Sequence, residues 1–209
     1  MKNLLYFLIV IVLFSSCSEY QKALKNEDPT VKLDMATKMY ELGKFNQSLR
    51  LIEQIAGVYR GRPDAEQLFY MYAQSYYKTK QYYLAGYQFE SFAANYPKSQ
   101  KLEEASFLGA KSYSKLSPVF SLDQVDTYKA IEKLQNFIDE YPESTYLTDA
   151  NIVAKDLREK LEKKAFETAK QYNTIENHKA AVVALDNFII NYPGTPFKEK
   201  ALYYKLDSA

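Results

Sequence analysis

The chain has 209 residues with 27 basic and 26 acidic side chains, so it lacks the basic excess that binding to nucleic acid requires. A single cysteine excludes an intrachain disulfide, and the stability of the fold must therefore come from packing. The 20 tyrosines and 12 phenylalanines suit half-buried faces. Six glycines and seven prolines leave little scope for hairpins, so we expect helices.

The N-terminus has the pattern of an export signal. Lys2 is followed by an apolar run over 4–14, two serines and Cys17. Such a run is too short to span a bilayer but has the length of a signal-peptide core. The segment resembles a bacterial lipoprotein signal. This resemblance implies that residues 1–16 are a signal peptide that is removed, that Cys17 carries S-diacylglycerol and an N-acyl group, and that 17–29 is a lipidated linker.

Three Tyr-Pro pairs predict helix ends at recurring points, because proline stops a helix and disfavours the α region for its predecessor. They are Tyr96-Pro97, Tyr141-Pro142 and Tyr192-Pro193. The residues eleven, seven and four positions before each tyrosine share one helix face and are predicted to be core. These residues are Ala85, Phe89 and Phe92; Ala130, Leu134 and Phe137; and Ala181, Leu185 and Phe188, with Ser48, Ile52 and Ile55 as their equivalents before Tyr59.

The helices that precede these segments repeat in their own register. Ala36 and Met39, Ala73 and Tyr76, and Ala110 and Tyr113 recur at an interval of 37 residues. The two patterns together resemble the tetratricopeptide repeat. We therefore predict an all-α fold, a tetratricopeptide-like solenoid of helix-turn-helix repeats over 30–209, with four complete units and a partial fifth. The predicted units are 30–59, 63–96, 99–141, 145–192 and 195–209.

The second half of the chain departs from the regular repeat. Segment 117–122 is an added loop with apolar side chains, which is either folded back on the array or held by a partner. The helix of the fourth unit is longer than its counterparts. In the last unit Thr195 is the expected N-cap of a helix that starts at Pro196. We also expect the natural chain to continue past Ala209, because an array needs a capping helix.

No catalytic pattern stands out in the sequence. His178 is the only histidine, so a histidine-based metal cluster cannot form, and the acidic residues alternate with lysines as on solvated helix faces. The sequence also lacks a glycine-rich phosphate loop. We expect a binding protein that is not an enzyme, with no cofactor, no metal and no small-molecule substrate. A role for His178 in an enzymatic function is the alternative, and His178→Ala would test it.

A concave surface lined by the first helix of each unit is the expected binding site. Tyrosine rings in such a groove suit an extended peptide, although some of these tyrosines could instead seal the contact between units. The candidate groove residues are Leu33, Thr37, Tyr40, Tyr70, Gln74, Tyr77, Phe107 and Lys111.

The lipoprotein signal, the short lead with Asp28-Pro29, the Tyr-Pro closures and the elongated helix together resemble the BamD-like family of outer-membrane assembly lipoproteins. The tyrosine-rich composition and the lead 18–22 resemble its Bacteroidetes version. The resemblance implies a lipid-anchored protein of the outer membrane that faces the periplasm. Its implied partners are a BamA-like barrel insertase and unfolded precursors of outer-membrane proteins. A periplasmic scaffold for cell-envelope or division enzymes is the alternative function, and a glycan-binding lipoprotein is a third.

Overall fold

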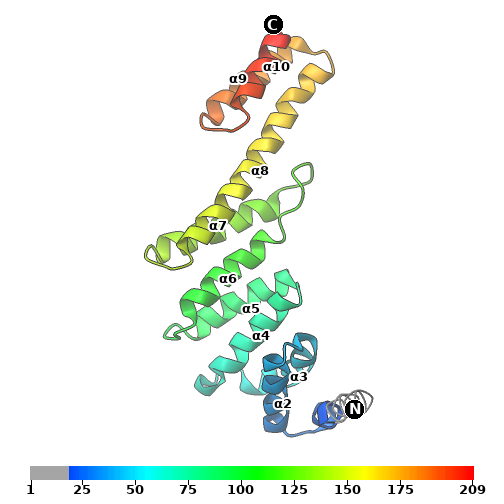
Figure 1. The fold of residues 1–209 in the computed structure, drawn as a ribbon, viewed down its shortest axis with the longest axis vertical. Helices are drawn as coiled ribbons and strands as arrows, with labels where there is room; N and C mark the ends of the chain where they lie inside the picture. Colours follow the sequence, from blue (N-terminus) through cyan, green and yellow to red (C-terminus); the bar gives the residue numbers. More distant parts are fainter. Residues whose placement is uncertain (1–18) are drawn as a thin grey trace, which may run out of the picture. The chain divides into compact units, whose positions relative to one another are not determined.

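The computed structural model describes residues 19–209, and it is all-helical, with no strand among those residues. The all-α prediction is therefore confirmed. The predicted signal peptide and Cys17 lie outside the described residues. The chain divides into two compact units, 1–109 and 110–209 (Figure 1). No described helix is both long and apolar enough to cross a membrane.

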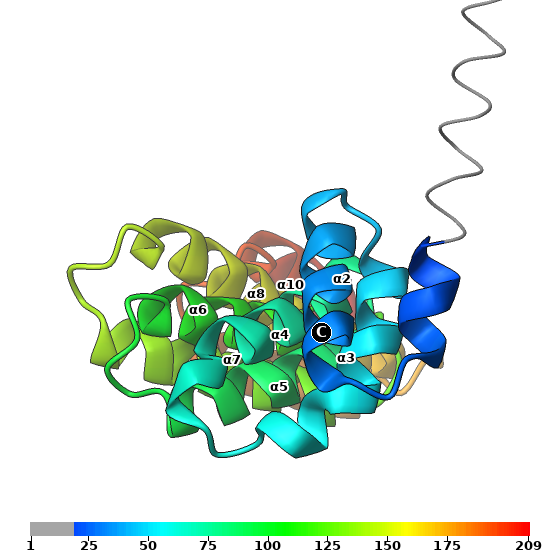
Figure 2. The same ribbon diagram turned by 90° about the horizontal axis from the view of Figure 1, so that it is seen from below.

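The first unit contains two helix pairs, preceded by helical residues 19–25. Helix α2 packs along α3, and α4 packs along α5; Figure 2 shows the first of these pairs from below. The elements are α2 (Pro29–Glu41), α3 (Phe45–Tyr59), the 3-10 turn η1 (Pro63–Ala65), α4 (Glu66–Lys78) and α5 (Tyr82–Asn95), and the boundary between the units falls inside α6 (Leu102–Ser114).

The predicted helix faces form the core. In α5, Ala85 and Phe89 are fully buried and Phe92 is nearly so, and the equivalent residues Ser48, Ile52 and Ile55 of α3 are buried as well. Ala36, Met39, Ala73 and Tyr76 of the first helices are also buried. Both registers read from the sequence are confirmed here, because the residues that they single out are those shielded from water.

The turn inside a helix pair has a recurring geometry. After α2, Gly43 adopts a positive φ of 70°, and the backbone N–H of Lys44 donates to the Met39 carbonyl at 2.8 Å. After α4, Lys80 takes the same position with φ 62°, and the N–H of Gln81 donates to the Tyr76 carbonyl at 2.9 Å. These bonds satisfy carbonyls that the end of a helix leaves free.

The Tyr-Pro closures end helices as predicted. Each tyrosine is the C-cap of its helix, and its ring packs on the phenylalanine four residues earlier, with ring centroids 5.3 Å apart for Phe92 and Tyr96. The same pairing recurs at 5.2 Å for Phe137 and Tyr141 and for Phe188 and Tyr192.

The helices that follow these closures begin later than expected. Ser99, Ser144 and Thr195 each donate a backbone N–H to the carbonyl of the closing tyrosine, and their hydroxyls accept an N–H two residues further on. This turn delays the helix. Thr195 is consequently not an N-cap, and α10 starts at Lys198 instead of Pro196.

The second unit contains α7 (Val125–Glu140), the 28-residue α8 (Leu147–Thr174), α9 (His178–Asn191) and α10 (Lys198–Asp207). The C-terminal half of α8 packs against both α9 and α10. Phe166 lies at the centre of this packing, with its ring 5.5 Å from that of Phe197 and 5.7 Å from that of Phe188. The long helix predicted for this region is confirmed.

The added loop is held by lysines of α8. Lys160 Nζ donates to Ser117 Oγ at 2.6 Å, and Lys164 Nζ donates to the Leu122 carbonyl at 2.6 Å. Lys163 Nζ lies 4.4 Å from the centre of the Phe120 ring. These contacts favour the folded-back interpretation of the loop, although Val119 and Leu122 stay exposed.

Candidate functional site

A groove runs between α2 and α4 in the first unit. One part has a volume of about 610 Å³ and is lined by Thr37, Tyr40 and Glu41 of α2, by Gln67, Tyr70 and Met71 of α4, and by Pro63, Asp64, Glu66 and Lys101. An adjoining part of about 400 Å³ shares Thr37, Glu41 and Met71 with it and extends to Leu33. The groove follows two neighbouring helices, which suits an extended ligand.

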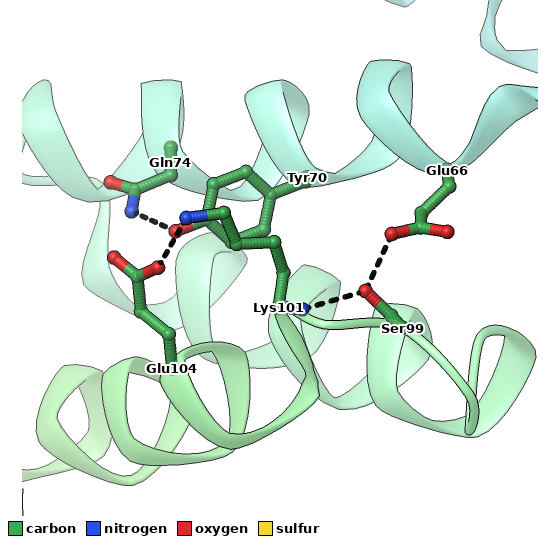
Figure 3. Close-up of polar contacts among 6 residues, drawn as sticks. All are labelled: Glu66, Tyr70, Gln74, Ser99, Lys101 and Glu104. Carbon is green, nitrogen blue, oxygen red and sulfur yellow. Dashed lines mark hydrogen bonds and ion pairs between the residues drawn. The ribbon is translucent and has the colours of Figure 1, made fainter. Parts of the chain in front are cut away.

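Tyr70 is held in place by both ring packing and hydrogen bonding. Its ring meets those of Phe89 and Phe92 edge-on, with centroids 6.3 and 5.5 Å away. Gln74, one turn later on α4, donates from Nε2 to the Tyr70 hydroxyl at 2.8 Å (Figure 3). Gln74 itself is only 7% exposed, so its part is to orient Tyr70 rather than to present a free amide.

The turn after α5 supplies the charged rim of the groove (Figure 3). Ser99 Oγ donates to Glu66 Oε1 at 2.6 Å and accepts the backbone N–H of Lys101 at 2.9 Å. Lys101 Nζ pairs with Glu104 Oε2 at 3.0 Å and lies 5.4 Å from the centre of the Tyr70 ring. The recurring Tyr-Pro turn thus places a lysine over an aromatic face.

The tyrosine hydroxyls of the groove remain protonated at neutral pH. Burial raises the pKa of Tyr70, and the Glu104 carboxylate raises it further, while the bond from Gln74 acts in the opposite direction. Burial and Glu104 also raise the pKa of Tyr40, against a smaller opposing effect of Lys101. The groove therefore offers hydroxyl and ammonium donors beside the carboxylate of Glu41, an arrangement that can bind the polar backbone of a peptide. The carboxylate of Asp64, by contrast, is bonded through both oxygens to Arg62.

The structure brings together four of the predicted groove residues, Leu33, Thr37, Tyr40 and Tyr70, with Gln74 behind them. Tyr77 is half-buried and packs edge-on against Tyr82 and Phe89, so it belongs to the packing of the second helix pair.

Two other predicted groove residues, Phe107 and Lys111, are not among the lining residues of this groove. Phe107 is 2% exposed, and its prediction as a groove residue is wrong because the side chain is in the core. Lys111 belongs to the second compact unit, where its Nζ lies 4.0 Å from Asp149 Oδ2.

Sequence reasoning missed the contribution of the turns. Asp64 and Lys101 line the groove although neither is on the first-helix face that was used for the prediction. The two residues are 37 positions apart, which is the repeat interval of the first helices. The repeat register could therefore have identified them as equivalent positions.

Residues 26–209 match the family model of YfiO, described as outer membrane lipoprotein. The chain belongs to this family. The match to YfiO begins just before α2 and runs through α10, so it covers helices α2 to α10 and leaves out helical residues 19–25. No curated protein matches the chain.

Proposed function

We propose that this YfiO-family lipoprotein is a scaffold of the β-barrel assembly machinery with no catalytic step of its own. It is anchored through acylated Cys17 to the outer membrane and faces the periplasm. There it binds unfolded precursors of outer-membrane proteins and a BamA-like barrel insertase, and so promotes assembly and insertion. The family match over residues 26–209 carries this proposal.

The groove of the first unit supports the binding of an unfolded client. A partly unfolded chain presents free backbone donors and acceptors, and side chains that alternate along an extended strand. The Tyr40 and Tyr70 hydroxyls, Lys101 and the carboxylate of Glu41 offer partners for such a backbone. The ring of Tyr70 offers apolar contact area that loses little conformational entropy on binding.

A substitution that fills the groove tests the proposal without disturbing the core. Gln67 is exposed and lines both parts of the groove. We expect Gln67→Trp to weaken binding of a peptide from a barrel strand about tenfold, a change of roughly 1.4 kcal/mol in binding free energy. Gln171→Trp, at an exposed glutamine of α8, is the matched control and should leave the affinity unchanged. Equal affinities of the two variants and the parent protein would contradict the groove assignment.

Depletion in cells tests the wider role. The proposal predicts that outer-membrane barrels fall in abundance when the protein is depleted, and that the acylated protein purifies from membranes with a barrel insertase. Normal barrel levels, together with co-purification of cell-wall or division enzymes, would instead identify a scaffold for those enzymes.

A further inference from the structure

The segment that begins two positions after Cys17 is part of the folded first unit. Residues 19–25 are helical, and Tyr20 and Ala23 are 4% and 3% exposed. Both belong to the same buried cluster as Met39 and Ile55, and Leu24 packs against that cluster. The interpretation of 17–29 as a linker is therefore wrong for residues 19–25, because their apolar side chains are used as core.

Polar contacts fix the same segment to α2. Glu19 Oε2 pairs with Lys38 Nζ at 2.7 Å. Further along, the N–H of Asp28 donates to Asn26 Oδ1 at 2.8 Å, and Asp28 Oδ1 accepts the N–H of Thr30 at 2.8 Å as the cap of α2. The chain is thus held by side-chain contacts from Glu19 to the start of the first helix pair.

The short chain from acylated Cys17 to Glu19 limits the distance between the first unit and the membrane. Glu19 comes two positions after Cys17 along the chain, and an extended chain spans at most about 7 Å over that interval. The headgroup layer on each side of a bilayer is of similar thickness, roughly 5–8 Å. An acyl group on Cys17 would therefore bring Glu19 to the level of the headgroups.

The exposed side chains of this segment suit that position. Lys22 and Lys25 are exposed and three residues apart, so they lie on one side of the helix. Neither lies within ion-pair distance of an acidic group in the part of the chain that the structure describes, although Lys38 chiefly, and Lys22 to a smaller extent, lower the pKa of Glu19. The helix over 19–25 carries two lysines and one glutamate, so it presents a net positive charge, which anionic headgroups attract.

We propose that helix 19–25 mounts the first unit directly on the membrane surface, with Lys22 and Lys25 facing the phosphates of anionic phospholipids. This proposal rests on the proposed acylation of Cys17. As a consequence, the packed helix 19–25 holds the groove of the first unit close to the lipid surface, whereas a flexible linker would let it move away.

Tryptophan fluorescence tests the contact, because the chain contains no tryptophan of its own. The probe is the acylated full-length protein in vesicles of phosphatidylethanolamine and phosphatidylglycerol that contain lipids brominated near the headgroup. We expect the emission of a Gln21→Trp variant, at an exposed position of helix 19–25, to be quenched severalfold more than that of Tyr83→Trp, at an exposed position of α5. Equal quenching of the two variants would overturn the proposal.

A second experiment tests the rigid mount. A dye on Leu42→Cys, at the exposed C-cap of α2, reports energy transfer to acceptors on the lipid headgroups. Inserting twelve Gly-Ser residues after Ser18 adds a coil with a mean span of about 20 Å, so the transfer should fall. Tyr20→Ala should have the same effect by releasing the helix, whereas Tyr20→Phe should not. Unchanged transfer after the insertion would contradict the mount.

The two proposals fail in different ways. Protein that does not float with the vesicles would contradict the acylation of Cys17 and the proposed anchoring. Protein that floats with the vesicles, but shows equal quenching of Gln21→Trp and Tyr83→Trp and unchanged energy transfer after the insertion, would contradict only the contact of helix 19–25 with the membrane.

Discussion

Replacing Phe89 with alanine tests whether the repeat register determines the stability of the first unit. The Phe89 side chain is 0% exposed, and its ring centroid lies 6.3 Å from that of Tyr70 and 6.5 Å from that of Tyr77. Helix α6 approaches closely at Gly109, where an added Cβ would lie 3.2 Å from the Phe89 Cβ. These neighbours cannot collapse freely into the space that the ring leaves, so we expect a cost of about 3–5 kcal/mol in unfolding free energy.

The part of the molecule that Phe89→Ala destabilises is as informative as the size of the loss in unfolding free energy. At 4–8 °C per kcal/mol for a domain of this size, the midpoint of thermal unfolding of the first unit should fall by roughly 20 °C. In a repeat array contacts are local, so hydrogen exchange should accelerate most in α4 and α5. Leu185→Ala, at the equivalent buried position of α9, should instead accelerate hydrogen exchange most in α9 and α10. A cost below about 1 kcal/mol, or the same exchange pattern in both variants, would refute the reasoning.

Three further predictions concern the turns and the tyrosines. Ser99→Ala removes the bonds to Glu66 and to the backbone of the turn and should cost about 1 kcal/mol in urea unfolding. Lys80→Gly should stabilise by about 1 kcal/mol because it relieves a positive φ, whereas Gly43→Ala should destabilise; the reverse order would contradict the turn geometry. Because burial raises the pKa of Tyr70, its protonated state stabilises the fold below the pKa of an unfolded tyrosine, about 10. This stability is lost as the pH rises above that value. The urea midpoint of unfolding should therefore fall above about pH 10, and it should fall less in the Tyr70→Phe variant than in the parent protein.

The predicted core follows from sequence because helix periodicity needs no knowledge of the partner surface. Ala85, Phe89 and Phe92 are spaced to share a face, and burying that face is the only way to remove it from water. Helix starts after the Tyr-Pro closures were harder to predict. Ser99 and Thr195 have the residue type of an N-cap, but their hydroxyls bond within a turn that comes before the helix.

The binding surface was only partly predictable for a different reason. Tyr40 and Tyr77 are similar in sequence position and type, and each packs edge-on against the ring five residues later, Phe45 or Tyr82. Tyr40 nevertheless lines the groove between α2 and α4, whereas Tyr77 does not. Phe107 shows the same limit, since a position on the first-helix face turned out to be core. Which side of an aromatic ring meets water depends on the helix packed against it, and the spacing of residues within a single helix does not specify that neighbour.

The sequence by itself determined the helical repeat and its two buried registers, because these depend on spacing within single helices. The predicted lipoprotein signal also rests on a local pattern, and it lies outside the described residues. Only the tertiary structure decided that Lys101 reaches over Tyr70, that lysines of α8 hold the added loop, and that Tyr20 joins the core. These contacts join residues that are far apart in the chain, and their free energy depends on how the helices pack rather than on any local pattern.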